Sequence, residues 1–159
     1  MDETVYNNYK SAGKIAAKAR NHGAELIKEG VSFLSVANAV EELIKEHGAG
    51  IAFPVNISIN EIAAHYSPRH DDKLVFSKGD VVKLDVGAHI DGYIADTAVT
   101  IEVGTNNFAD MIKASSDALD AAIGIVKADI NLSDIGKVVQ DTISAAGFKP
   151  ISNLTGHNL

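Results

Sequence analysis

The sequence predicts an α+β protein built around an antiparallel sheet. Two helical patterns come first, a strand and a β-hairpin follow, and two more helical patterns come after the hairpin. Helices and strands therefore occur in blocks, whereas a parallel sheet would need them to alternate along the chain. The hairpin is indicated by Asp91-Gly92, because an Asp-Gly pair between two strand-like runs is the strongest short-range hairpin signal.

The first 48 residues are predicted to form two helices. Apolar residues recur at helical spacing over residues 3–29, and the glycine that follows is expected to end this helix as a C′ residue. Gly23 is a weak point inside it, because glycine lowers helix propensity. The second helix begins at Ser32 or Ser35 and stops at Gly48.

The middle of the chain is predicted to be a strand, a loop and the hairpin. Apolar and polar residues alternate over residues 53–60, which indicates a strand. Residues 61–73 contain a proline and many charges and are expected to form a loop, and residues 78–80 turn into the hairpin.

Two helices are predicted after the hairpin. The first covers residues 107–128, and the second starts with Ser133 as its N-cap, runs to about Ala146 and is ended by Gly147. The segment after it is expected to become extended. It repeats the order helix, glycine, phenylalanine and proline seen in residues 47–58, which hints at a duplicated architecture whose second copy has just begun.

The hairpin places two acids on one face. A two-residue turn at Asp91 and Gly92 pairs Asp85 with Ala98, and side chains alternate faces along a strand. Asp85 and Asp96 are then diagonal neighbours, with Cα atoms roughly 7–8 Å apart. The remaining residues of this face are small or apolar, apart from one histidine: Gly87, His89, Ile94 and Ala98. The other face is the expected core and carries Leu84, Val86, Ala88, Ile90, Tyr93, Ala95, Val99 and Ile101.

Two acids on a strand face are often just a solvated surface, but such a surface usually also carries Lys, Glu and Thr. The small neighbours of Asp85 and Asp96 therefore favour a site where two carboxylates converge on one or two cations. Oxygen ligands suit divalent Mg, Mn, Fe, Co or Zn. His89 is a third ligand, a supporting donor or a structural hydrogen-bond partner, the last being favoured.

Two other histidines are weaker candidates on their surroundings alone. His65 lies in the predicted loop beside small residues, and its ring titrates near neutral pH, so it can act as acid, base or polarising group. His157 is two residues from the end of the sequence, where a role is not indicated by spacing alone.

Composition restricts the class of protein. A net charge of −7 disfavours nucleic acid and anionic membranes as partners. The absence of cysteine excludes disulfides and thiolate metal sites. The polar N-terminus does not resemble a signal peptide, and no apolar run reaches the ~18 residues of a membrane span, so a cytoplasmic protein is expected.

Three segments resemble one enzyme family. AFPVNISINEIAAHYSP, KGDVVKLDVGAHIDGYIADTAVTI and LTGHNL are similar to the type 2 methionine aminopeptidases, especially the short archaeal form. The eleven-residue spacing of Asp85 and Asp96 and the AAHYSP stretch carry this resemblance. It implies a pita-bread fold with a site for two divalent metal ions that removes the initiator methionine from nascent polypeptides.

The resemblance also implies a role for individual residues. Asp85 resembles a ligand of one metal, Asp96 the aspartate that bridges both, and His157 a ligand of the other. His65 resembles the histidine that contacts the substrate and stabilises the transition state, and Phe53 resembles part of the pocket for the methionine side chain. The identity of the metal among Co, Mn, Fe, Zn or similar ions stays open.

The resemblance implies that residues 1–159 are the N-terminal half of the catalytic domain. The family completes its site with two glutamates and a further histidine that lie beyond residue 159. The expected partner is therefore the C-terminal half, in the same polypeptide or in a second chain, and residues 1–159 alone are expected to have little activity. Two alternatives are a prolidase-like dipeptidase of the same fold and a non-catalytic binding module, which would be expected to lose its metal ligands.

Overall fold

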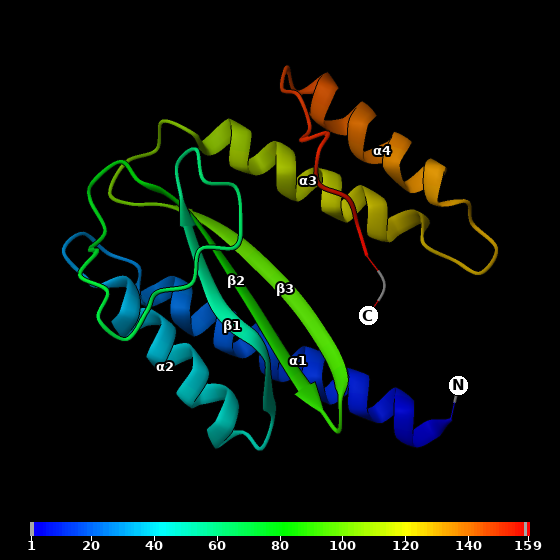
Figure 1. The fold of residues 1–159 in the computed structure, drawn as a ribbon. Coiled ribbons are helices and arrows are strands. Elements are labelled where there is room, and N and C mark those ends of the chain that lie inside the picture. Colours follow the sequence, from blue (N-terminus) through cyan, green and yellow to red (C-terminus); the bar gives the residue numbers. More distant parts are fainter. Residues whose placement is uncertain (1, 158) are drawn as a thin grey trace. The chain divides into compact units, whose positions relative to one another are not determined.

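The computed structural model describes residues 2–157 and 159, and it has the α+β composition that the sequence predicts. The chain divides into two compact units, of which the first ends at Thr105 and the second begins at Asn106. The first unit contains two helices and the sheet, and the second contains two helices (Figure 1).

Two capped helices open the first unit. Helix α1 spans Glu3–Leu26 and begins at Asp2, whose carboxylate accepts a hydrogen bond from the Thr4 amide at 2.7 Å. Helix α2 spans Phe33–Glu46 and begins at Ser32, which confirms one of the two predicted starts.

The predicted end of α1 is wrong by three residues. The backbone becomes extended at Ile27, whose side chain is buried in the core. Gly30 is therefore not the C′ residue of the helix. It adopts a φ of +80° in the connection to α2, where its amide donates to the Phe76 carbonyl at 2.8 Å.

The sheet consists of three antiparallel strands in the order β1-β2-β3. Strand β1 spans Gly50–Ile59, β2 spans Val81–Ile90 and β3 spans Tyr93–Glu102. Asp91 and Gly92 have φ values of +50° and +85°, as the type I′ hairpin turn requires at both central positions. The predicted hairpin is therefore confirmed, whereas β1 begins three residues earlier than predicted.

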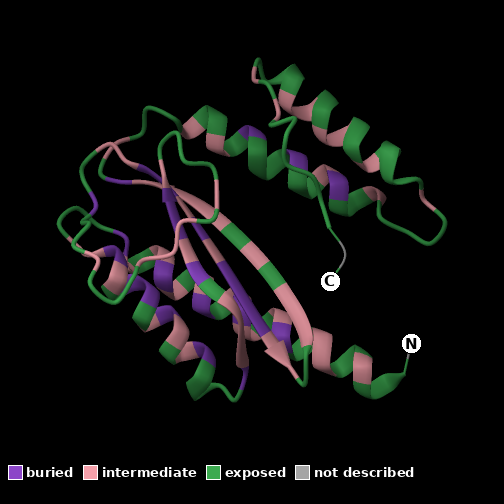
Figure 2. Cartoon of the chain, viewed as in Figure 1, coloured by how far each residue is buried: buried purple, intermediate pink, exposed green. Residues whose placement is uncertain are grey.

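Helices α1 and α2 cover one face of this sheet (Figure 1). The buried core between helices and sheet includes Leu84, Val86 and Ala88 of β2, which confirms the face predicted to be apolar. Strands β1 and β2 contain the buried sheet positions, whereas β3 is half-buried except at Asp96 and Ala98, which are exposed (Figure 2). The helices thus fix the back of the sheet and leave its other face to carry the two aspartates.

Gly23 is a packing position and not just a weak point of helix α1. A Cβ atom there would lie 2.5 Å from Val40 Cγ2 and 2.8 Å from Leu84 Cδ2. Only glycine lets α1 approach α2 and β2 this closely.

Replacing Gly23 with Ala is expected to lower the free energy of unfolding. Overpacking costs about 1–3 kcal/mol, which exceeds the gain of about 1 kcal/mol in helix propensity. Urea unfolding measures this, with Gly136→Ala as the control, because nothing lies within 4 Å of the Cβ that this second change adds. A stabilisation by Gly23→Ala equal to that of Gly136→Ala would contradict the packing argument.

The second unit is a pair of helices. Helix α3 spans Ala109–Ile125 and buries the stripe Ala114, Ala118 and Ala122, while helix α4 spans Leu132–Ala145. The predicted N-cap at Ser133 is wrong. The N-cap is Asn131, because Leu132 and Ser133 are already helical residues.

The end of the second unit differs from the predicted extended segment. Gly147 has a φ of +85° and follows α4 as predicted, but the described residues after it form no strand. The resemblance between residues 47–58 and 146–157 is therefore not matched by a second strand in the described part of the chain.

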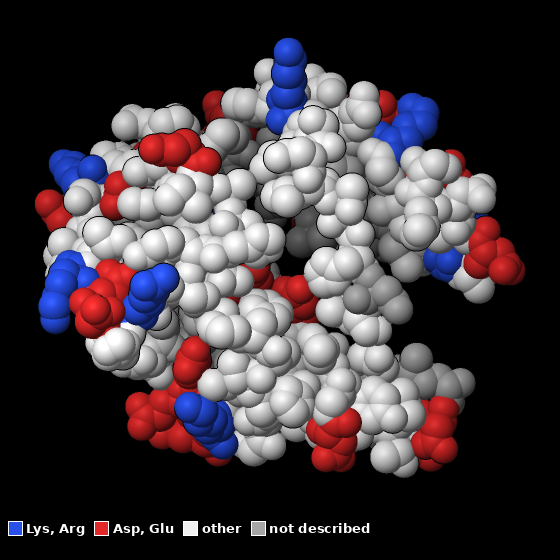
Figure 3. All heavy atoms as spheres, viewed as in Figure 1, with Lys and Arg blue, Asp and Glu red and all other residues white. Residues whose placement is uncertain are grey.

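Charged side chains of both signs are interspersed on the face of the molecule shown in Figure 3. This arrangement is typical of a solvated protein surface. None of the helices described here has the length and apolar character needed to cross a membrane.

Candidate metal centre

The two aspartates lie on the same face of the hairpin. Asp85 pairs with Ala98, and Gly87 pairs with Asp96, so the two acids are diagonal neighbours across β2 and β3. This confirms the register predicted from the Asp-Gly turn. Asp85 is half-buried and Asp96 is exposed.

The environment of Asp85 disfavours an isolated negative charge. Burial raises the pKa of Asp85, and the charge of Asp96 and a hydrogen bond with Asp96 raise it further. A hydrogen bond from Asn56 and the positive charge of His65 lower the pKa of Asp85, but the raising effects dominate. The fold therefore favours the protonated form of Asp85, and a cation bound beside the two acids would remove this penalty.

The donor set fits a metal ion but is incomplete. Asp85 Oδ1 is buried and has no hydrogen-bond partner among the described residues. Such an oxygen is costly to bury unless something positive meets it. Within residues 2–157 and 159, however, no three side chains of His, Asp or Glu gather closely enough to hold a metal.

His65 lies in the loop between β1 and β2 and is close enough to Asp85 to affect its pKa. Its backbone has a φ of +70°, a conformation that costs energy for a residue other than glycine. The residue after it holds this loop: the Ile57 amide donates to the Tyr66 carbonyl at 2.7 Å, and the Tyr66 amide donates to Ser58 Oγ at 3.2 Å. The imidazole is exposed.

Two irregularities in β1 determine which side chains join the aspartates. The pairing of β1 with β2 shifts between Ile51 and Phe53 and again between Phe53 and Asn56. Phe53 pairs with Gly87 and Asn56 pairs with Asp85, so both lie on the face of the acids although they are three positions apart. A bulge re-aims side chains in this way.

The second bulge also leaves a backbone group to be satisfied. The Val55 amide donates to Glu41 Oε1 of helix α2 at 3.3 Å. Helix α2 thereby stabilises the irregular part of β1 that carries Phe53 and Asn56.

The Phe53 ring lies on β2 at Gly87, next to both acids. A Cβ atom at Gly87 would lie 2.2 Å from Phe53 Cε1, so the ring sits directly on this glycine. Gly87 follows Asp85 by two residues on the same face and pairs with Asp96. An aromatic wall therefore stands beside the carboxylates.

His89 has a structural position. A Cβ at Gly50 would lie 2.2 Å from His89 Nε2, so the ring packs on β1 at the end of the hairpin. The Gly92 amide donates to His89 Nδ1 at 3.2 Å, which stabilises the turn. This agrees with the favoured interpretation of His89 as a hydrogen-bond partner.

His157 lies in the second unit and is exposed. Its role as a ligand stays a prediction from the resemblance.

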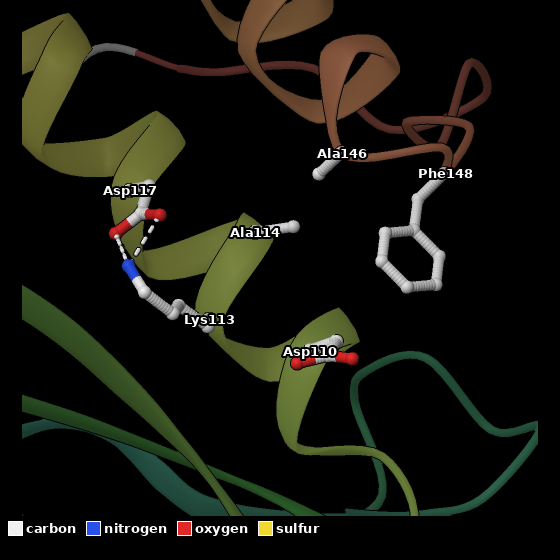
Figure 4. A pocket seen from close by; sticks show the side chains of 6 residues that line it. All are labelled: Asp110, Lys113, Ala114, Asp117, Ala146 and Phe148. Carbon is white, nitrogen blue, oxygen red and sulfur yellow. Dashed lines mark hydrogen bonds and ion pairs between the residues drawn. The ribbon is translucent and has the colours of Figure 1, made fainter.

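The second unit contains a hollow of about 280 Å³ between α3 and the end of α4 (Figure 4). It is lined by Asp110, Lys113, Ala114, Asp117, Ala146 and Phe148. Lys113 is already paired with Asp117 at 2.6 Å, and both side chains are exposed, so the lysine that lines this hollow is not an unpaired cation for a ligand.

The sequence did not predict three of the residues that surround Asp85 and Asp96. Gly87 gives room for Phe53, Asn56 contacts Asp85, and Ser67 donates to Asn56 Oδ1 at 2.7 Å. No spacing rule reveals them, because the bulges in β1 decide which residues of FPVN face the aspartates. Pro54 in the middle of a strand was the one available signal, since proline in a strand often marks a bulge.

Comparisons with known proteins match this chain along its whole length. The sequence profile of metallopeptidase family M24 matches residues 7–159. The methionine aminopeptidase of Archaeoglobus fulgidus is 54% identical over 159 residues, which are 100% of this chain and 54% of that protein. The chain spans about half the length of the first curated relatives that it matches.

Solved structures share the fold. The methionine aminopeptidase of Thermotoga maritima aligns with 99% of this chain and 66% of its own, with a TM-score of 0.92 and 29% identity. The prolidase of Pyrococcus horikoshii aligns with 92% of this chain and 43% of its own, with a TM-score of 0.80 and 29% identity. These likenesses confirm the pita-bread fold implied by the sequence.

Proposed function

Because this chain belongs to metallopeptidase family M24, we propose that it is the first half of a methionine aminopeptidase, a hydrolase that removes the N-terminal methionine from nascent polypeptides. The Archaeoglobus relative that aligns with the whole chain carries that name. A cytoplasmic location fits this substrate, because nascent chains are made there.

One observation carries the proposal. Asp85 and Asp96 lie together beside an aromatic wall, and Asp85 Oδ1 is buried without a partner among the described residues. A purely structural acid would be expected to have its buried oxygen satisfied. A metal ligand needs that oxygen to remain available.

The proposed ligands are Asp85, Asp96 and His157. Asp85 would hold one of two divalent ions, Asp96 would bridge both, and His157 would hold the other. Carboxylate and imidazole donors suit Co, Mn, Fe and Zn, so the donor set does not select one of them. When bound, two such ions supply a hydroxide near neutral pH and polarise a carbonyl.

The remaining steps belong to side chains of the chain. The His65 imidazole would donate a hydrogen bond to the oxygen of the scissile carbonyl, where negative charge develops in the transition state. The face of the Phe53 ring would seat the unbranched methionine side chain, whose sulfur makes favourable contacts with aromatic rings.

We further propose that a second half completes the site. The first matched relatives are about twice as long as this chain. Helices α3 and α4 and the residue that follows α3 expose several large apolar side chains, namely Leu119, Ile123, Val126 and Leu132. Such an apolar surface is expected to be covered in the complete protein. The second half would supply the missing ligands, either in the same polypeptide or as a separate chain.

An activity assay tests the function. The full-length protein with Mn²⁺ or Co²⁺ is expected to release methionine from Met-Ala-Ser, whereas residues 1–159 alone are expected to show little or no turnover. Robust turnover by residues 1–159 would contradict the need for a second half. Preferential cleavage of Ala-Pro would favour a prolidase-like activity, which the likeness to the Pyrococcus prolidase makes the second candidate.

Metal analysis separates an enzyme from a binding module of the same fold. The full-length protein is expected to bind a divalent metal stoichiometrically. Purified protein that takes up no divalent metal and cleaves neither peptide would overturn the proposed function.

A further inference from the structure

Asn56 stands between the loop of His65 and the Asp85 carboxylate. The bulge in β1 places Asn56 opposite Asp85, so the two side chains lie on one face of neighbouring strands. Asn56 is half-buried, so its amide has few alternatives to partners from the protein.

The Asn56 amide has a defined orientation. Its Oδ1 accepts a hydrogen bond from the Ser67 hydroxyl at 2.7 Å, which leaves its NH₂ group to donate to Asp85. The opposite orientation would turn the amide oxygen toward a carboxylate, which accepts hydrogen bonds but cannot donate them when ionised. The Ser67 hydroxyl therefore donates to Asn56, and the Asn56 amide donates in turn to the Asp85 carboxylate.

The same segment fixes His65. The two residues that follow His65 are both bonded to β1: Tyr66 to Ile57 and Ser58, and Ser67 to Asn56. The Tyr66 ring also packs edge-on against the Phe33 ring, with the two ring centroids 6.3 Å apart, and this contact further holds Tyr66 in place. The loop that follows His65 is therefore held to β1 by three hydrogen bonds, one of which ends at Asn56, the residue that contacts Asp85.

We propose that Asn56 is a positioning residue: the Ser67 hydroxyl orients its amide, and the amide orients the Asp85 carboxylate so that Oδ1 stays available to a metal ion. This inference deepens the proposed function and rests on it, because it takes Asp85 as a ligand. The device also links the position of His65 to the position of Asp85.

Groups that hydrogen-bond a metal ligand tune its affinity. Loss of such a partner typically costs about 10–100-fold in metal affinity. A purely structural role for Asn56 predicts something else, namely a lower melting temperature with unchanged metal affinity in the folded protein. The two roles are therefore separable by a binding measurement made below the melting transition.

The test is a Co²⁺ titration of the full-length protein, followed by its visible absorption spectrum and by thermal unfolding without metal. Asn56→Ala is expected to weaken Co²⁺ binding about 10–100-fold and to change the absorption bands, because the ligand geometry changes. Asn38→Ala is the matched control, since Asn38 is exposed on α2.

Variants at Ser67 test the relay. Ser67→Ala is expected to weaken Co²⁺ binding about 2–10-fold, the size expected from one neutral hydrogen bond, and Ser67→Thr is expected to restore it because it keeps the hydroxyl. Once Asn56 is Ala, Ser67→Ala is expected to add nothing. Independent, additive effects of the two changes would overturn the relay.

The outcomes distinguish this inference from the proposed function. A wild-type protein that binds Co²⁺ and cleaves Met-Ala-Ser, together with an Asn56→Ala variant of equal affinity and unchanged spectrum, would refute the positioning role alone. A wild-type protein that binds no Co²⁺ would refute the proposed function, and the inference would fail with it.

Discussion

Replacing Asp85 with Asn is expected to abolish metal binding and activity while making the metal-free protein more stable at neutral pH. Asparagine has the shape of the protonated carboxyl and keeps a hydrogen-bond donor for Asp96. It removes the charge that burial and Asp96 both disfavour. The loss of metal affinity is expected to exceed the ~10–100-fold cost of losing a supporting residue.

Thermal unfolding with and without Co²⁺ measures both effects. The wild-type protein is expected to gain about 2.7 kcal/mol when free metal is 100-fold above its dissociation constant, and the variant is expected to gain nothing. The order of melting temperatures should therefore reverse when metal is added. Asp117→Asn is the control, because it removes a carboxylate from an exposed ion pair with Lys113.

The pH dependence of stability provides a second test of the Asp85→Asn prediction. The pKa of Asp85 is raised above its ordinary value of 3.8, so the fold favours the protonated form. Its contribution to stability is therefore fully present below 3.8 and is lost as pH rises through the pKa in the folded protein. The free energy of unfolding of the metal-free wild-type protein is expected to fall as pH rises through the pKa of Asp85. The Asp85→Asn variant is expected to lack this pH-dependent decrease, because asparagine does not ionise. A variant less stable than wild type at neutral pH without metal would contradict the prediction.

The hairpin could be predicted because its determinants are local. The turn type follows from Asp91 and Gly92, and the turn fixes the register of every pair up to Val81 and Glu102. The position of Asp85 beside Asp96 then follows from alternation alone. The core face follows from the same alternation, which is why Leu84 and Val86 were predicted to be buried.

The surroundings of the aspartates could not be predicted because they depend on tertiary contacts. Simple alternation would place Phe53 with the buried Val55 and Ile57, but the bulges move it to the opposite face. The bulge is stabilised by Glu41, whose carboxylate accepts a hydrogen bond from the Val55 amide, 14 residues later in the chain. Helix ends were missed for a similar reason: Ile27 leaves the helix to enter the core, which no capping signal shows.

Replacing Gly87 with Ala is expected to impair methionine recognition more than it impairs folding. The added Cβ would lie 2.2 Å from Phe53 Cε1 and 2.6 Å from Phe53 Cδ1, so the ring cannot stay where it is. Overpacking costs about 1–3 kcal/mol if the ring is trapped, and less if it swings away. The wall beside the aspartates is displaced in either case, so KM for Met-Ala-Ser should rise while metal affinity stays near that of the wild-type protein.

Two further variants decide whether Phe53 carries this effect. Gly50→Ala is the matched control, because its Cβ would meet the His89 ring at 2.2 Å, at the turn end of the hairpin. It is expected to cost stability without changing the preference for methionine. Phe53→Ala removes the ring that Gly87→Ala displaces, so the double variant should lose no more recognition than Phe53→Ala alone. A Gly87→Ala protein with unchanged KM would show that the Phe53 ring does not contact the substrate, because no accommodation of the added methyl leaves the ring in place.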